Sequence, residues 1–454
     1  MKPNLLFIIT DQQRYDAVGY NNRLVKTPNI DQLASQSLVC HQVIVQSPQC
    51  QPSRASLLTG IYPDNLCMWW NETKLNLNNI TIGNILRDNG YNTGYFGKLH
   101  IDSELNHKQT CKHFGFDHSF LTEDWMNLLS KLSKTDPGGI RSVRREFFSI
   151  MSKNHDPDMS DYLAPWTGKL SSAKYHHEEI ITNHAADFIK RQNGKPFACF
   201  VSFRGPHPPY AAPPPYNDMY KLGELPLPDR IIPNDYGHML SSRYWHHIKS
   251  QYYGAIAWID YYIGQLLELI EDDTIVVFTS DHGDILGDHG LFSKGIYTYD
   301  GNIRVPLVIK NKRYSHLDYQ HPVQLIDLLP TLLSMMNIET NHCLDGIDLS
   351  NYFIDNRSAQ DYTFSAIGVE QRIYMTRSNN YKYVHDLNNE QFYDLINDPL
   401  EQHNNINNEQ YSDLVLKLKI TLSQHLSNLK QYDAGVHPNI HNTRTQAINI
   451  NYFM

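Results

Sequence analysis

Asn4-Leu-Leu-Phe-Ile-Ile-Thr10, followed directly by Asp11-Gln12-Gln13, is a short apolar run that ends in polar side chains. A run that is apolar at successive positions is typical of a strand buried on both faces of a parallel sheet. Two further apolar runs, residues 197–203 and 274–280, also end in polar clusters. Because ligands of open parallel sheets bind beyond the carboxyl ends of strands, these clusters predict one shared crevice.

Helix signals lie between the apolar runs. They cover residues 31–37 after Pro28, residues 82–89 before Gly90, and a long amphipathic stretch at 241–270. Alternating strands and helices predict an α/β core, with a large, mostly parallel sheet flanked by helices.

The pattern changes near residue 345. Short strand-like segments separated by Asn-rich turns follow, at 372–378, 381–386 and 391–393. They predict an antiparallel meander, and a helix is expected at about 409–429. We therefore expect an α/β domain at residues 1–345 and a smaller α+β subdomain at 346–454. No helix or strand is predicted for residues 120–175 or for the Pro-rich loop 206–233.

Composition excludes several classes of protein. The net charge is −9 and 19% of residues are charged, so no basic field is available to bind nucleic acid or an anionic membrane. The apolar run near the amino terminus is far shorter than the ~20 residues of a membrane-spanning helix. Six cysteines without CxxC spacing predict neither a zinc knuckle nor a disulfide framework. We expect a cytoplasmic protein; its oligomeric state is open.

A cysteine stands at the start of a predicted helix in Cys50-Gln-Pro-Ser-Arg54-Ala-Ser-Leu-Leu-Thr-Gly60. Pro52 suits the first helical turn and Gly60 the end, which places Cys50 just ahead of the helix. Unpaired N–H groups there favour an anion by ~0.3–1 kcal/mol, and Arg54 adds a cation. A lone cysteine before a helix is more often core packing, but this pattern favours an anion site.

Cys-x-Pro-Ser-Arg followed by Ala-Ser-Leu-Leu-Thr-Gly resembles the signature of the type I sulfatases, within the alkaline phosphatase superfamily. The resemblance continues along nearly the whole chain, through Asp11, Gly97-Lys98-Leu99-His100, Gly205-Pro206-His207-Pro208, Asp281-His282-Gly283 and Tyr393-Asp394-Leu395. It implies an alkaline phosphatase-like fold and hydrolysis of a sulfate monoester. It also implies that a maturation enzyme reads the Cys-x-Pro-x-Arg core and oxidises Cys50 to formylglycine, whose hydrated aldehyde is the nucleophile.

A metal site is expected at two of the strand ends. A sulfate monoester is an anion that repels nucleophiles, and a divalent metal can neutralise its oxygens. Asp11 and Asp281 are hard oxygen ligands, and Gln12 and His282 stand beside them as in the family's metal site. Ca²⁺ is the expected ion, with Mg²⁺ or Mn²⁺ as alternatives. Sulfatases often have Asp and Asn in place of Gln12 and His282, so the ion stays open. A single Asp after a strand would instead suggest a helix cap.

The remaining catalytic candidates are basic. Lys98 and His100 would point the same way if their segment is extended. The resemblance implies that Lys98 holds sulfate or the formylglycine hydrate. His100 then takes the proton from the second hydroxyl, which expels sulfate. His207 and Lys294 resemble the pair that contacts a sulfate oxygen and the leaving group, either one being the general acid. Arg54 would orient the modified residue.

Substrate contacts are expected from Trp70, Asn71 and His289, although a role in packing is equally plausible for them. Other aromatic and histidine residues lie on the long helical stretch, where a core or rim role is expected: His246, His247, Tyr252, Tyr253, Tyr261 and Tyr262.

The nearest rival function is a phosphonate monoester or phosphodiester hydrolase of the same superfamily. That branch resembles this chain in Asp-Gln after the first strand, in Asp-His-Gly, and in the Asn after Trp-Trp. It carries Tyr-x-Thr where Lys98 and His100 stand, so the pair favours a sulfatase. The expected partners are a small sulfated substrate and the maturation enzyme; a sugar, alkyl or aryl sulfate all remain open.

Overall fold

β1 (Leu5–Asp11) is an inner strand of an eight-stranded sheet, and each of its residues is buried. The computed structural model describes residues 2–132, 167–226, 242–314, 316–369, 372–387 and 389–429. β1 pairs in parallel with β8 (Ile275–Ser280) on one side and with β6 (Phe197–Pro206) on the other. The three apolar runs are therefore adjacent strands, and their polar ends meet at one edge, as predicted.

The sheet is mostly parallel, which confirms the predicted fold class. Its strand order is β10-β2-β9-β8-β1-β6-β3-β4. The other strands are β2 (Leu38–Ile44), β3 (Asn92–Gly97), β4 (His118–Leu121), β9 (Leu307–Lys310) and β10 (Leu317–Gln324). Only β9 runs antiparallel to its neighbours in this sheet.

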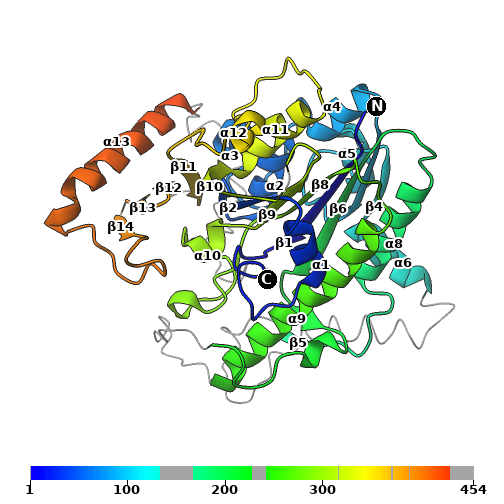
Figure 1. Cartoon of the computed structure of the whole chain (residues 1–454), viewed down its shortest axis with the longest axis horizontal. Coiled ribbons are helices and arrows are strands. Elements are labelled where there is room, and N and C mark those ends of the chain that lie inside the picture. Colours follow the sequence, from blue (N-terminus) through cyan, green and yellow to red (C-terminus); the bar gives the residue numbers. More distant parts are fainter. Residues whose placement is uncertain are drawn as a thin grey trace.

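Helices cover both faces of the sheet (Figure 1). On β1, Leu5, Phe7 and Ile9 face one apolar core, and Leu6 and Ile8 face the other. The continuous apolar run reflects these two cores, since alternate side chains of a strand point to opposite faces. The first core is covered by α2 (Cys50–Thr59), α4 (Ile82–Asp88), α5 (His107–His113) and α11 (Leu328–Met335). The second is covered by α1 (Pro28–Ala34), α8 (His177–Lys190) and α9 (Ser242–Leu267).

The predicted meander is present in the carboxyl-terminal part of the chain. It comprises β12 (Ile373–Arg377), β13 (Tyr381–His385) and β14 (Gln391–Asp394), and β11 (Thr363–Ile367) adds a strand that the prediction missed. α13 (Ser412–Asn428) packs on this sheet. The division of the chain at residue 345 stays a prediction, and residues 430–454 of the expected subdomain lie outside the described part.

Short helices and strands occur in the two segments, residues 120–175 and 206–233, for which the sequence predicted no helix or strand. These segments hold β4, α6 (Thr122–Leu132), β5 (Thr167–Lys169), β7 (Tyr210–Ala212) and η1 (Tyr216–Asp218). Residues 133–166 and 227–241 lie outside the described residues. The remaining short helices are α3 (Pro63–Leu66), η2 (Asp288–Gly290), α10 (Asp300–Ile303), η3 (Leu325–Asp327), α12 (Ser350–Asp355) and η4 (Glu409–Tyr411). Among the described helices, none has the length and apolar character needed to cross a membrane.

A buried charge cluster ties the small sheet to α10. The Lys382 ammonium, fully buried, donates to Asp300 Oδ1 and Glu401 Oε1, both at 2.6 Å. Arg377 donates from Nε and Nη2 to the two carboxylate oxygens of Asp300, at 3.1 and 2.9 Å. Burial alone would raise the pKa of Asp300, but Arg377 and Lys382 hold it well below its ordinary value.

Replacing Lys382 by Met should lower the free energy of unfolding by about 3–5 kcal/mol, because Asp300 and Glu401 would lose a buried cation. Lys74→Met is the control, since Lys74 forms an exposed pair with Glu104, and exposed pairs contribute little. Urea unfolding of the two variants measures the difference. Equal stability of both variants would contradict a structural role for the buried cluster.

Candidate active site

The first turn of α2 presents Cys50 at the carboxyl edge of the main sheet. The helix begins at Cys50 itself, which corrects the expectation that Cys50 lies ahead of it. The reason is that Ser53 N–H donates to the carbonyl of Gln49 at 3.0 Å, which closes a turn around Cys50. Gly60 ends the helix with a left-handed φ of 68°, as predicted. Ser53 Oγ also donates to the carbonyl of Asp281 at 2.5 Å, which joins the helix start to the end of β8.

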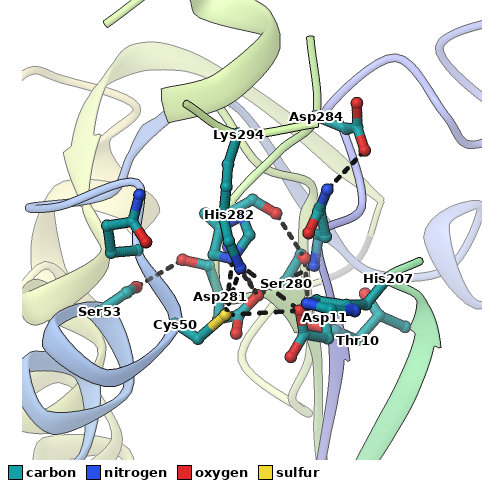
Figure 2. A network of polar contacts seen from close by, with 12 residues as sticks. Thr10, Asp11, Cys50, Ser53, His207, Ser280, Asp281, His282, Asp284 and Lys294 are labelled. Carbon is teal, nitrogen blue, oxygen red and sulfur yellow. Dashed lines mark hydrogen bonds and ion pairs between the residues drawn. The ribbon is translucent and has the colours of Figure 1, made fainter. Parts of the chain in front are cut away.

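Basic side chains surround the Cys50 sulfur (Figure 2). Its nearest partners are Lys294 Nζ at 2.7 Å, His282 Nε2 at 3.2 Å and Lys98 Nζ at 3.6 Å. Burial raises the pKa of the thiol, but Lys294, Lys98 and His282 outweigh it and lower the pKa well below the ordinary value. The position of residue 50 therefore stabilises a negatively charged side-chain atom.

Lys98 and His100 both reach Cys50, although their segment is not extended. His100 has a left-handed φ of 48°, so the extended backbone on which the shared direction of the two side chains was conditional is not present at His100. The Lys98 carbonyl accepts hydrogen bonds from Arg54 Nη1 at 2.6 Å and Ser202 Oγ at 2.7 Å, so it is drawn away from a strand ladder. Lys98 Nζ also forms an ion pair with Asp11, and His100 lies near enough to Cys50 to lower the pKa of its thiol.

Arg54 lies between two buried carboxylates. Its Nε donates to Asp281 Oδ2 at 2.7 Å and its Nη2 to Asp11 Oδ2 at 3.2 Å. The guanidinium is 1% exposed and both acids are fully buried. Arg54 bonds neighbours of residue 50, namely Asp11, Asp281 and the Lys98 carbonyl, so any orientation of that residue by Arg54 would act through them.

Asp11, Asp281 and His282 form a compact cluster with Cys50. One ligand atom from each residue lies within 4.8 Å of all the others, and all four residues are buried. His282 Nδ1–H donates to the carbonyl of Gly283 at 2.8 Å, so Nε2 faces the cluster and, once deprotonated, would offer its lone pair to a cation. Two carboxylates and an imidazole in this arrangement fit a divalent cation.

Gln12 supplies a further oxygen beside this cluster. Its N–H donates to Asp281 Oδ1 at 3.0 Å, and its Nε2 donates to Asp284 Oδ2 at 2.7 Å and Ser293 Oγ at 3.0 Å. Among the described residues, Gln12 Oε1 is buried and has no hydrogen-bond partner. Because buried polar atoms are ordinarily bonded, this orphaned oxygen also fits a bound cation.

His207 and Lys294 complete the basic surroundings of residue 50. His207 Nδ1 donates to the carbonyl of Pro208 at 2.7 Å, and Cys50 is among the groups near enough to affect the pKa of the ring. Burial lowers the pKa of His207 to about 4, with Lys98 and Lys294 acting in the same direction and Asp11 against them. The pKa of Lys294 is raised, because Cys50 and Asp11 outweigh the opposing effect of burial.

The three substrate candidates have other contacts in the described part of the chain. Asn71 Oδ1 accepts from Gln51 N–H at 3.1 Å, which places Asn71 at the start of α2. His289 stacks on Tyr299, with ring centroids 3.8 Å apart. The carbonyl of Trp70 accepts a hydrogen bond from Thr73 Oγ1 at 2.8 Å. A role in substrate binding stays a prediction for all three.

Sequence reasoning missed several residues that hold the site together. Asp284 accepts from Gln12, and the only signal for it is its position directly after Asp-His-Gly. Ser202 accepts from Arg54 Nη1 at 2.8 Å, and Tyr210 Oη donates to Asp284 Oδ2 at 2.5 Å. Single Ser and Tyr residues without a motif give no such signal. Tyr252, expected in the core or rim, is buried and donates from Oη to the carbonyl of Gln12 at 2.7 Å.

Comparison with known proteins agrees with the sequence signature. The sulfatase family matches residues 3–338, and the N-sulphoglucosamine sulphohydrolase C-terminal family matches residues 287–428. An arylsulfatase of Clostridium perfringens is 28% identical, over 95% of this chain and 96% of its own. The sulfatase YidJ of Escherichia coli, described as uncharacterized, is also 28% identical, over 94% of this chain and 88% of its own.

Solved structures agree on the fold. The phosphonate monoester hydrolase of Agrobacterium radiobacter superposes with a TM-score of 0.78 at 23% identity, covering 94% of this chain and 96% of its own. At that identity the likeness concerns the fold alone. The family match covers most of the sequence, including the cysteine signature and all three strand-end clusters. The chain belongs to the type I sulfatase family and is a sulfuric ester hydrolase.

Proposed function

We propose that the enzyme hydrolyses a small sulfated substrate with a formylglycine made from Cys50 and one divalent cation. The observation that carries the proposal is the set of partners around the Cys50 sulfur, where Lys294, Lys98 and His282 converge on a buried atom. In this structure the sulfur stands in for the oxygens of the formylglycine hydrate. Lys294 and Lys98 would contact those oxygens and support their negative charge, whereas His282 would bind the cation.

The cation would be held by Asp11, Gln12, Asp281 and His282. When bound, it neutralises sulfuryl oxygens and helps ionise the nucleophile. Three oxygen ligands and one imidazole suit Ca²⁺, with Mg²⁺ or Mn²⁺ as alternatives. The support comes from the compact cluster of Asp11, Asp281 and His282 and from the buried, unpartnered oxygen of Gln12.

The reaction then divides into two steps. One hydroxyl of the hydrate loses its proton to water, and the resulting oxyanion attacks sulfur. The bond between sulfur and the alcohol oxygen breaks, and His207 or Lys294 protonates the leaving alcohol. In the second step His100 takes the proton of the remaining hydroxyl, the carbonyl re-forms, and sulfate leaves. Water then restores the hydrate. Lys294 contacts residue 50, and His207 lies near enough for Cys50 to affect its pKa, which supports the assignment of both to the first step.

The same fold serves phosphonate monoester hydrolases, so the choice of sulfate rests on particular residues. Lys98 and His100 both reach residue 50, and Lys98 also pairs with Asp11. A cation and a base placed beside the nucleophile suit neutralisation of a sulfate oxygen and collapse of a hemiester. The proposal requires a maturation enzyme as partner, and cytoplasmic location stays a prediction.

Cys50→Ala should lower kcat/KM for a sulfate ester by at least ~10³-fold, because the nucleophile is lost. Peptide mass spectrometry of active protein, co-expressed with a maturation enzyme, should find formylglycine at residue 50. Cys199→Ala is the matched control, since Cys199 is also buried but lies in β6 within the core. Full activity of Cys50→Ala would refute the proposed nucleophile.

Lys98→Tyr combined with His100→Thr should lower sulfatase kcat/KM by at least ~10²-fold, the usual scale for losing a positioned acid or base. Activity on a phosphodiester should fall much less, because the pair serves the sulfate reaction. The exposed neighbours Lys108→Tyr and His107→Thr provide the control. Steady-state kinetics on a sulfate ester and a phosphodiester measure the two effects. Equal losses of kcat/KM on both substrates would show that Lys98 and His100 support the pocket generally and do not select sulfate.

A further inference from the structure

The main chain of Gln12 is held from two sides at the end of β1. Its N–H donates to Asp281 Oδ1 at 3.0 Å, and its carbonyl accepts from Tyr252 Oη at 2.7 Å. The residue adopts a left-handed φ of 71°. That conformation is uncommon for a residue other than glycine and persists only where surrounding contacts impose it. The Gln12 side chain therefore leaves the strand end in one imposed direction.

The orientation of the Gln12 carboxamide follows from its neighbour Asp284. Nitrogen and oxygen of an amide are usually assigned by their hydrogen bonds, and a carboxylate can only accept. The amide atom 2.7 Å from Asp284 Oδ2 must therefore be Nε2, which also lies 3.0 Å from Ser293 Oγ. Oε1 then occupies the other side of the planar group, where it is buried and unpartnered among the described residues.

Asp284 is itself fixed by two other donors. Tyr210 Oη donates to Oδ2 at 2.5 Å, and the backbone N–H of Leu286 donates to Oδ1 at 2.8 Å. Asp284 is fully buried, and it is not part of the cluster formed by Asp11, Cys50, Asp281 and His282. The hydrogen bond from Gln12 Nε2 links the Asp284 side chain to the residue beside that cluster.

We infer that Asp284 is a positioning residue that requires an amide at residue 12 and turns its oxygen toward the cation. This inference rests on the proposed function, because it needs the divalent cation. A carboxylate at residue 12 would meet the Asp284 carboxylate at hydrogen-bond distance, where two like charges repel or must share a proton. An amide at residue 12 avoids this repulsion, because its NH₂ group donates to Asp284 while its oxygen remains available to the cation.

The test is a double-mutant cycle in cation affinity. Full-length protein, co-expressed with the maturation enzyme and freed of metal by chelation, is titrated with Ca²⁺ and separately with Mn²⁺ by calorimetry. Gln12→Glu should weaken binding through repulsion from Asp284. Asp284→Asn should also weaken it, because an amide at residue 284 can turn its NH₂ toward residue 12 and reverse the Gln12 amide. In the double variant, the amide of Asn at position 284 can donate to the carboxylate of Glu at position 12, so the repulsion is removed.

The expected coupling is at least ~10-fold in Kd: the double variant should bind at least tenfold more tightly than the two single effects predict together. Asp288→Asn is the matched control. Asp288 lies in the same loop but pairs with Arg14, so it should show no coupling with Gln12→Glu. Circular dichroism of the metal-free proteins reports folding. If Gln12→Glu fails to fold, Asp284→Asn should restore folding and Asp288→Asn should not.

The possible results distinguish a failure of the role inferred for Asp284 from a failure of the proposed cation site. Cation binding by the native protein with additive effects at residues 12 and 284 would overturn the role of Asp284 and leave the proposed function intact. Absence of any Ca²⁺ or Mn²⁺ binding by the native protein would overturn the proposed cation site itself. The inference is supported if Gln12→Glu and Asp284→Asn are strongly coupled in the binding of both Ca²⁺ and Mn²⁺, while Gln12→Glu and Asp288→Asn are not coupled.

Discussion

The site depends on one buried interaction, in which Arg54 of α2 lies between Asp11 and Asp281 at the ends of two adjacent strands. Both carboxylates are fully buried, and buried like charges are unfavourable unless a cation compensates them. Arg54 also donates to the Lys98 carbonyl, so it joins the segment after β3 to the same point. Because Arg54 and Cys50 share one helix, this interaction also places residue 50 beside the two acids.

At this edge Lys98 and Lys294 converge on residue 50 while the acids stay paired, and under the proposed function a substrate anion would meet these positive groups. Lys98 contacts Asp11 and Cys50, and Lys294 contacts Cys50. The net charge of the chain is −9, so the attraction for a sulfate ester is local. Burial strengthens each of these interactions, because the low dielectric of the interior weakens screening. The same burial makes every missing partner costly, which explains why so many side chains from distant elements converge here.

Much of the fold could be predicted because its signals are local. The apolar runs that became β1, β6 and β8 are continuous since both faces of the sheet are covered, and their polar ends identified the edge that carries the site. The left-handed backbone at Gln12 and His100 could not be predicted, because contacts between distant segments impose it. The bond between Gln12 and Asp284 joins residues 272 positions apart, and no local pattern encodes it. β11 was missed for a similar reason, since pairing with β12 defines it.

The proposed divalent cation at the ends of β1 and β8, beside residue 50, can be sought directly by anomalous diffraction from crystals of the matured enzyme grown with Mn²⁺. The expected result is one strong peak within about 2.6 Å of oxygen atoms of Asp11, Gln12 and Asp281, the range for hard cations, with His282 Nε2 as a further ligand. Electron density at residue 50 should show oxygen atoms next to that peak. A strong peak elsewhere, with none between Asp11 and Asp281, would contradict the proposed site.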